Sequence, residues 1–596
     1  MPLDWNLITV GALQSIALDG LLPSAERQEC LDYGQELSRI ENDERWSTAQ
    51  KACICFAKHV LMMVLRADDP TEPYGAMLEL NNGRSALPGD FPKDELNRLV
   101  SWAMSLTNPE LRARFLDIIW VQGRYYPAAR EAVNSYLEAA KHLEDPHHWP
   151  PCFTRLTRAL RLAAGLGKGG ERLRVEVLQH ISATLDRHPG TDPLYLSLGL
   201  IKLLNEFKHG DPRYFAVFAQ TAGDAACIDR NYWRAKDYFD LVAECYRLAG
   251  DAENFGDAAR QAAECLVLEA RQAMTQPGRG AMVGASLISD AVEAMRQVPG
   301  GKERAAELHA ELLKLQSTAM DELTPVSTSI NIHKLTEQAV LDVKGRPLSE
   351  AILRLCRMAG PPSVKELRDR VYKTAKVAPL GALVSVEVVN ARGRVVALVP
   401  GLSDASADPI DPALRWRMFQ DAARLRGITV QAMFHPARLV ILEQHSPTEQ
   451  EISDLVQHSP CIPPSHHCSV VRALTAGFHG DWLIVGHIVP SQFEAVVRHL
   501  VEAIGGTTSM LVPGGIQPER TLSVLLESPE AQKVFGEDGV FELQDLLADS
   551  LGANLRNEVA HGLVDDEGMF NTEVMYAWWL LLRYCVLTLR PLAGQN

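Results

Sequence analysis

Apolar positions recur at helical spacing over roughly the first 320 residues of the chain. Residues 108–110, Asn-Pro-Glu, form a typical helix start, with a capping side chain, a proline at the first helical position and then an acid. Apolar residues between 111 and 119 share one face, and Gly123 ends the segment. A second helix is predicted over 128–142.

A similar pair of helices is predicted over 231–250 and 254–270. In both pairs a helix is followed by a glycine, an aromatic residue and an alanine-rich helix, which loosely resembles tetratricopeptide-like hairpins. Such hairpins need neighbours that cover their apolar faces. We therefore predict a helical-hairpin array over residues 1–330, with an irregular packed helical domain as the alternative.

The middle of the chain, residues 331–476, is predicted to be a mixed α/β connecting domain. The β-branched-rich runs 383–389 and 395–399 flank the turn sequence Asn-Ala-Arg-Gly and predict a β-hairpin. The runs 429–434 and 438–442 would add two more strands.

Helical periodicity returns over residues 477–596, which are predicted to form a helical bundle. Asn571 is expected to cap its last helix. Tyr576, Trp578 and Trp579 give that helix apolar surface on more than one side, which suggests that both the bundle and a partner cover it. Helices are predicted over 490–504, 519–527, 540–549 and 572–589. The fold class predicted for the whole chain is mostly α.

The charge is unevenly distributed. The 596 residues include 59 Lys and Arg and 75 Asp and Glu, a net charge of −16. This balance excludes a generally basic protein that coats nucleic acid, but it does not exclude a local basic surface. Residues 346–427 carry 14 basic and 8 acidic side chains, a net of +6, whereas residues 477–596 carry 6 and 16, a net of −10.

Three features favour a cytoplasmic protein. The eleven cysteines are an odd number without a dense framework, as in reduced proteins. The first ten residues do not read as a signal peptide. The most apolar stretch, 576–589, is interrupted by Arg583 and is shorter than the about 20 apolar residues of a membrane span. No membrane association is expected.

The strongest local signal is the segment 555–562, Leu-Arg-Asn-Glu-Val-Ala-His-Gly. Asn554 can cap a short helix there, and the glycine can end it. Asn557 and His561 would then lie one turn apart on the same side, with Arg556 on the flank. The segment gathers a guanidinium, an amide and an imidazole on one short helix.

This Arg-Asn-x-x-x-His motif, followed by a long apolar helix, resembles the HEPN superfamily, whose signature is an arginine, then four to six residues, then a histidine. Segments 519–522, 540–543 and 555–562 further resemble the C-terminal domain called domain of unknown function 4209. The resemblance covers roughly the last 120 residues, enough for a helical bundle.

The resemblance implies a homodimeric, metal-independent endoribonuclease that uses no cofactor and forms one composite active site from two motif helices. Arg556 and His561 match the signature positions, and Asn557 matches the polar position that often follows the arginine. In this chemistry the ribose 2′-OH attacks the adjacent phosphate, the histidine moves protons and the arginine neutralises the developing charge. Such nucleases often act in prokaryotic defence or growth arrest, and the helical array would then serve as sensor or regulator and offer a surface for a protein partner.

RNA affinity rests on the neutralisation of phosphates, which an acidic C-terminal region does not supply alone. The basic middle region therefore provides the RNA-binding candidates Arg392, Arg394, Arg415 and Arg417, with a solvated charged face as the alternative.

Three alternatives to a nuclease remain open at this stage. The C-terminal bundle could be a non-catalytic module that binds RNA or nucleotides, because many members of the superfamily are degenerate. It could serve only to dimerise a helical adaptor. The motif itself could be structural, with Arg556 paired to Asp549 or Asp565 and His561 holding a helix end.

Overall fold

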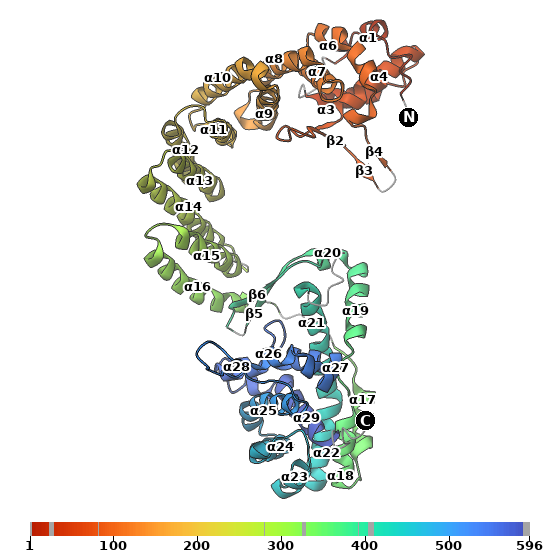
Figure 1. The fold of residues 1–596 in the computed structure, drawn as a ribbon, viewed down its shortest axis with the longest axis vertical. Helices are drawn as coiled ribbons and strands as arrows, with labels where there is room; N and C mark the ends of the chain where they lie inside the picture. Colours follow the sequence, from red (N-terminus) through yellow and green to blue (C-terminus); the bar gives the residue numbers. More distant parts are fainter. Residues whose placement is uncertain are drawn as a thin grey trace. The chain divides into compact units, whose positions relative to one another are not determined.

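The structure is a computed structural model that describes residues 3–22, 29–80, 83–278, 280–322, 324, 329–390, 392–402 and 411–587. It is mostly α-helical, as predicted, and its strands form two-stranded pairs (Figure 1). The chain divides into two compact units, Met1–Glu322 and Leu323–Asn596. No helix among the described residues has the length and apolar character needed to cross a membrane.

Unit 1 contains helices and two short antiparallel strand pairs, β1 (Val64–Leu65) with β2 (Tyr74–Gly75) and β3 (Glu79–Leu80) with β4 (Gly83–Arg84). Its helices are α1 (Val10–Ile16), α2 (Leu18–Leu21), α3 (Cys30–Ile40), α4 (Thr48–Leu61), α5 (Lys93–Arg98), α6 (Val100–Ser105), α7 (Pro109–Gly123), α8 (Tyr126–His142), α9 (Pro150–Gly165), α10 (Glu171–Arg187), α11 (Leu196–Glu206), α12 (Pro212–Ile228), α13 (Tyr232–Leu248), α14 (Ala252–Ala273), α15 (Gly280–Gln297) and α16 (Lys302–Glu322).

From α7 to α16 each helix packs against the next, so the predicted array of helical hairpins is confirmed as an architecture (Figure 1). The Asn108 side chain accepts hydrogen bonds from the backbone N–H groups of Glu110 and Leu111, at 2.9 and 3.3 Å, and so caps α7. The helix α13 begins directly after Asn231, the first residue of the predicted segment 231–250, and the Asn231 side chain caps it by accepting from the Arg234 N–H at 3.2 Å. Local capping chemistry therefore defines where these hairpins begin.

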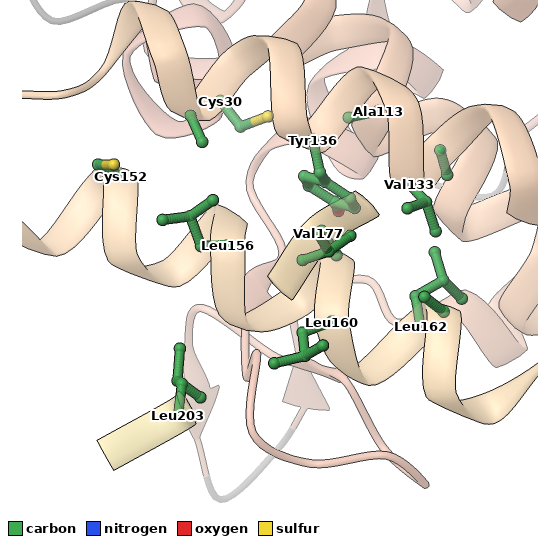
Figure 2. Packing of buried hydrophobic residues seen from close by; sticks show 14 of the residues in the cluster. Cys30, Ala113, Val133, Tyr136, Cys152, Leu156, Leu160, Leu162, Val177 and Leu203 are labelled. Carbon is green, nitrogen blue, oxygen red and sulfur yellow. The ribbon is translucent and has the colours of Figure 1, made fainter. Parts of the chain in front are cut away.

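Apolar side chains from several of these helices form one continuous core in unit 1. Figure 2 shows part of this core, where α9 packs between its neighbours. The labelled side chains are Cys30, Ala113, Val133, Tyr136, Cys152, Leu156, Leu160, Leu162, Val177 and Leu203.

A buried polar network lies within this core. The Asp117 carboxylate is fully buried and accepts two hydrogen bonds from Arg158, both at 2.8 Å. It also accepts from the hydroxyl groups of Tyr74 and Tyr136, at 2.6 and 2.9 Å. Burial alone raises the pKa of a carboxyl group, but the charge and hydrogen bonds of Arg158 hold the Asp117 pKa below its ordinary value. Asp117 is therefore ionised and fully paired.

The described residues of unit 2 form helices, one β-hairpin of β5 (Val386–Val389) with β6 (Val395–Val399), and two isolated antiparallel bridges, Ser509 with Glu519 and Val512 with Ile516. Two π-helical turns, Val430–Phe434 and Gln544–Ala548, follow α21 and α27. Its helices are α17 (His333–Val343), α18 (Leu348–Arg357), α19 (Val364–Val377), α20 (Pro379–Leu383), α21 (Pro412–Thr429), α22 (His435–His445), α23 (Glu449–Val456), α24 (His467–His479), α25 (Trp482–Ala503), α26 (Leu522–Leu526), α27 (Pro529–Leu543), α28 (Leu555–Ala560) and α29 (Thr572–Leu587).

The last helix, α29, is the centre of unit 2 and packs against α18, α21, α23, α24 and α25. Trp578 and Trp579 are buried, and their indole N–H groups donate to the carbonyl oxygens of Leu474 and Leu355, at 3.0 and 2.9 Å. The apolar surface around α29 is therefore covered by its own chain and does not indicate a partner. The helices on both sides of the predicted 476/477 boundary share one core, so this boundary does not separate two structural units.

The predicted hairpin is confirmed, with Val386 opposite Val399 in an antiparallel pair. The two further strands predicted at 429–434 and 438–442 are wrong, because α21 continues through a π-helical turn into α22. Short apolar runs that are buried on several sides do not distinguish a strand from a helix. The described part of the middle region, 331–476, is therefore helical with a single hairpin.

Glu542, at the end of α27, provides a test of this core. Its side chain is buried and accepts a hydrogen bond from the Tyr576 hydroxyl at 2.6 Å, and burial raises its pKa from 4.5 to about 7. A raised folded-state pKa means that stability is lost as the pH rises from 4.5 to about 7, because only the unfolded chain ionises there. Glu542→Gln should therefore stabilise unit 2 by about 3 kcal/mol at pH 8 and leave it unchanged at pH 4.

Thermal or urea unfolding of both proteins at the two pH values measures this difference. The amide oxygen of glutamine can still accept the hydrogen bond from Tyr576, so the substitution changes the titration and not the hydrogen bond. The comparison at pH 4, where Glu542 is not ionised, therefore serves as the control for packing. An equal effect at pH 4 and pH 8 would contradict the titration of Glu542.

Candidate active site

The segment before α28 is fastened to the second π-helical turn. The backbone N–H groups of Ala553 and Asn554 donate to the carbonyl oxygen of Asp545, at 2.8 and 3.4 Å. Asn554 takes a left-handed conformation, with φ 50°, and begins the helix as expected. Its side chain does not cap the helix; its Oδ1 instead accepts from the Asn557 Nδ2 at 2.7 Å.

The other end of α28 closes in a Schellman arrangement, as the predicted glycine stop requires. Gly562 has a positive φ of 64°, and its N–H donates to the Val559 carbonyl oxygen at 3.1 Å. The N–H of Leu563 donates to the Glu558 carbonyl oxygen at 2.9 Å. His561 is held just before this turn, because its own N–H donates to the Asn557 carbonyl oxygen at 3.0 Å.

Arg556 pairs with a residue that the sequence does not indicate. Its Nε and Nη2 lie 3.0 and 2.9 Å from Oε2 of Glu494, which is on α25. The expected partners of the structural alternative, Asp549 and Asp565, do not form this pair. Glu494 also pairs with Arg498 at 3.2 Å, so it divides its charge between two guanidinium groups. The side chain of Arg556 remains about one third exposed, at 35 %. It can therefore still meet a phosphate.

Asn557 orients the arginine rather than the imidazole. Its side-chain Oδ1 accepts from Arg556 Nη1 at 3.0 Å, and its Nδ2 donates to Asn554. Both ends of the amide are therefore used, and the guanidinium is fixed from two sides, by Glu494 and by Asn557.

His561 is exposed, and no described residue forms a hydrogen bond with its ring nitrogens. Its backbone, not its side chain, takes part in the end of the helix. The imidazole is therefore available for proton transfer with a ligand, and its removal would delete little packing.

The basic candidates divide into two groups. Arg392 lies in the β5–β6 turn and its Nη2 reaches the Gly562 carbonyl oxygen, at 3.5 Å, so the hairpin meets the motif segment directly. Arg394 is exposed in the same turn. Both side chains are exposed, and the contact of Arg392 places this turn next to the motif segment.

Arg415 and Arg417 are engaged in the fold. Arg415 donates to Asp549 at 2.7 Å and to Gln544 at 3.1 Å. Arg417 donates to the backbone oxygens of Ala413 and Ala382, and burial lowers its pKa below the ordinary value for arginine. Both guanidinium groups therefore connect segments within unit 2 and stabilise its fold.

Two parts of this site could not be found from the sequence. Glu494 is one polar position in a predicted helix, 62 residues before its partner, and no local pattern links the two. The contact between Arg392 and Gly562 joins residues 170 apart. Only the tertiary fold brings them together.

Comparison with known proteins concerns the other unit. Residues 3–175 match a family model described as Domain of unknown function (DUF7380). No curated protein matches the chain. The matched region contains the buried Asp117 network and ends well before α28, so it bears on the core of unit 1 and not on the motif.

Proposed function

We propose that unit 2 carries a metal-independent endoribonuclease site of the HEPN type. The observation that supports this most is the motif segment 555–562, which carries a fixed, partly exposed Arg556 on α28 and an exposed His561 directly after that helix. These are the two side chains that metal-free cleavage of RNA requires, a phosphate-binding cation and a proton-transfer group.

The reaction forms a bond between the ribose O2′ and phosphorus and breaks the bond between phosphorus and the O5′ of the next nucleotide. A neutral imidazole takes the proton of the 2′-OH, and a protonated imidazole gives a proton to the leaving O5′. The guanidinium of Arg556 stabilises the extra negative charge on the phosphorane oxygens. The products are a 2′,3′-cyclic phosphate and a 5′-OH.

A two-fold homodimer supplies the two histidines that this scheme uses, one from each α28. Because α29 is covered within its own chain, the interface would be formed around α28 rather than by the last helix. Unit 1 would act as sensor or regulator and bind a protein partner, in a cytoplasmic system of prokaryotic defence or growth arrest.

A second candidate is a non-catalytic module that binds RNA or nucleotides. The observation that favours it is the ion pair of Arg556 with Glu494, which offsets part of the charge that a phosphate would meet. A catalytic Arg556 would have to exchange this carboxylate for the substrate.

The experiment that separates the two candidates is incubation of the full-length protein with single-stranded RNA, with and without EDTA. A nuclease of the proposed kind cuts equally in both and leaves 2′,3′-cyclic phosphate ends. Metal-dependent cutting would contradict the mechanism. Binding of RNA without cutting would support the non-catalytic module. Light scattering that finds only monomers would contradict a composite site formed by two copies of the chain.

Arg392→Glu is expected to weaken RNA binding, because it places a negative charge beside Gly562 and His561. Loss of one phosphate contact reduces the slope of log affinity against log salt by about 0.7, so the defect should shrink at high salt. Fluorescence anisotropy with labelled RNA over a range of salt concentrations measures this slope. Arg472→Glu, at an exposed position of α24 outside the hairpin and the motif segment, is the matched control for the change of charge. If Arg392→Glu leaves the affinity unchanged at low salt, the hairpin belongs to a solvated face.

A further inference from the structure

A cavity of 470 Å³ lies between α19 and α21 in unit 2, and α20 contributes part of its wall. This volume is within the range of about 300–1,000 Å³ that small-molecule sites occupy. None of the described lining residues belongs to the motif segment 555–562, and none of the proposed catalytic steps uses the cavity.

Three arginine residues line this cavity, and each of them can be reached from solvent. Arg370 of α19 is exposed, and no described residue forms a hydrogen bond or ion pair with it. The side chain of Arg424, on α21, is 65 % exposed and pairs with Asp421 at 2.8 Å. Arg417 of α21 is half-buried. Asp421 is the one acidic residue among the described lining residues, so three cations against one anion leave an excess of two positive charges.

Arg417 is a fixed positive charge in the wall of the cavity. Its Nη1 and Nη2 donate to the backbone oxygens of Ala413 and Ala382, at 3.0 and 2.9 Å, so it joins α20 to α21. Burial lowers its pKa below the ordinary value for arginine, which means that the fold does not fully replace the solvation that this cation loses. An anion in the cavity would stabilise the charged form.

The rest of the wall suits an organic ring. Ala375, Ala382 and Trp416 are half-buried lining residues that pack against the apolar core beneath the cavity. Thr374 and Gln420 are exposed lining residues, and their side chains can donate and accept hydrogen bonds. A largely apolar wall with a few polar groups is typical of sites that hold a small organic ligand in one orientation.

We infer that this cavity binds a nucleoside monophosphate, whose phosphate meets the arginines and whose base lies against the apolar wall. A phosphate monoester carries a charge of about −1.5 to −2 at pH 7, which matches the excess of two positive charges. Guanidinium groups bind phosphate oxygens through paired, charge-assisted hydrogen bonds. A phosphodiester in an RNA backbone carries only one charge, so the monoester fits better. The inference goes beyond the proposed function and does not depend on it, because it needs neither α28 nor cleavage.

Isothermal titration calorimetry of the full-length protein with AMP, GMP, CMP and UMP tests this binding directly. The corresponding nucleosides, which lack the phosphate, and inorganic phosphate, which lacks the base, are the control ligands. Arg370→Gln removes an exposed cation that has no described partner, so the variant should fold normally. Lys365→Gln removes an exposed cation from the same helix but outside the cavity, and it is the matched control.

At least one mononucleotide should bind, at least about tenfold more tightly than its nucleoside and than inorganic phosphate. Arg370→Gln should weaken this binding by at least about tenfold, the effect of losing one hydrogen bond between charged groups, and Lys365→Gln should leave it unchanged. The inference is overturned if no mononucleotide binds, or if Arg370→Gln and Lys365→Gln bind equally well. Single-stranded RNA that binds where no mononucleotide does, and that binds less tightly to Arg370→Gln, would also overturn it and assign the arginine to an RNA-binding surface.

Discussion

Replacing His561 by alanine is expected to slow RNA cleavage by about 10²–10⁴-fold, the usual contribution of a general acid–base group. The variant should fold normally, because the side chain is exposed and the helix end is made by backbone hydrogen bonds. Gel-based cleavage rates and a thermal melt of the same samples measure both effects. EDTA should change neither result.

His458→Ala is the matched control, since His458 is also exposed in unit 2 but lies outside the motif segment 555–562. Its cleavage rate should equal that of the unaltered protein. A His561→Ala protein that unfolds would favour the structural reading of the motif. An unaltered cleavage rate would exclude His561 from the chemistry, whatever the protein does with RNA.

The features that the sequence predicted correctly depend on local chemistry. The cap of α7 and the turn between β5 and β6 each use side chains within a few residues of the element they define. The motif helix belongs to the same class, because the stop at Gly562 and the spacing of Arg556 and His561 are local properties.

The features that it missed depend on packing. The runs 429–434 and 438–442 are predicted as strands, but in the fold they belong to one continuous helical stretch. The helix predicted to begin at Pro490 begins at Trp482, where Asp481 caps it, and the proline lies inside it. Glu494 could be identified as the partner of Arg556 only once distant helices were placed together. The same holds for Asp545 as the partner of Arg426.

The largest effect on stability is expected in unit 1, from Asp117→Ala. The substitution removes the carboxylate that satisfies Arg158 and two tyrosine hydroxyl groups, and it leaves a buried guanidinium without its counterion. Breaking a buried ion pair in this way costs about 3–5 kcal/mol. Because a folded domain is stable by only about 5–15 kcal/mol, the loss is a large part of the total.

Denaturant unfolding of the two proteins, followed by circular dichroism, measures the difference in the free energy of unfolding. Glu206→Ala is the matched control, since it removes another carboxylate from an arginine, Arg161, but at the surface of the same unit. Surface pairs contribute only about 0–1 kcal/mol, because water screens them and solvates the remaining charge. If both variants lose the same small amount, the buried network does not stabilise unit 1. If only Asp117→Ala shows the large loss, unit 1 requires the carboxylate of Asp117 as the counterion of Arg158. Arg158 is only 3 % exposed, so water cannot solvate its charge once that carboxylate is gone.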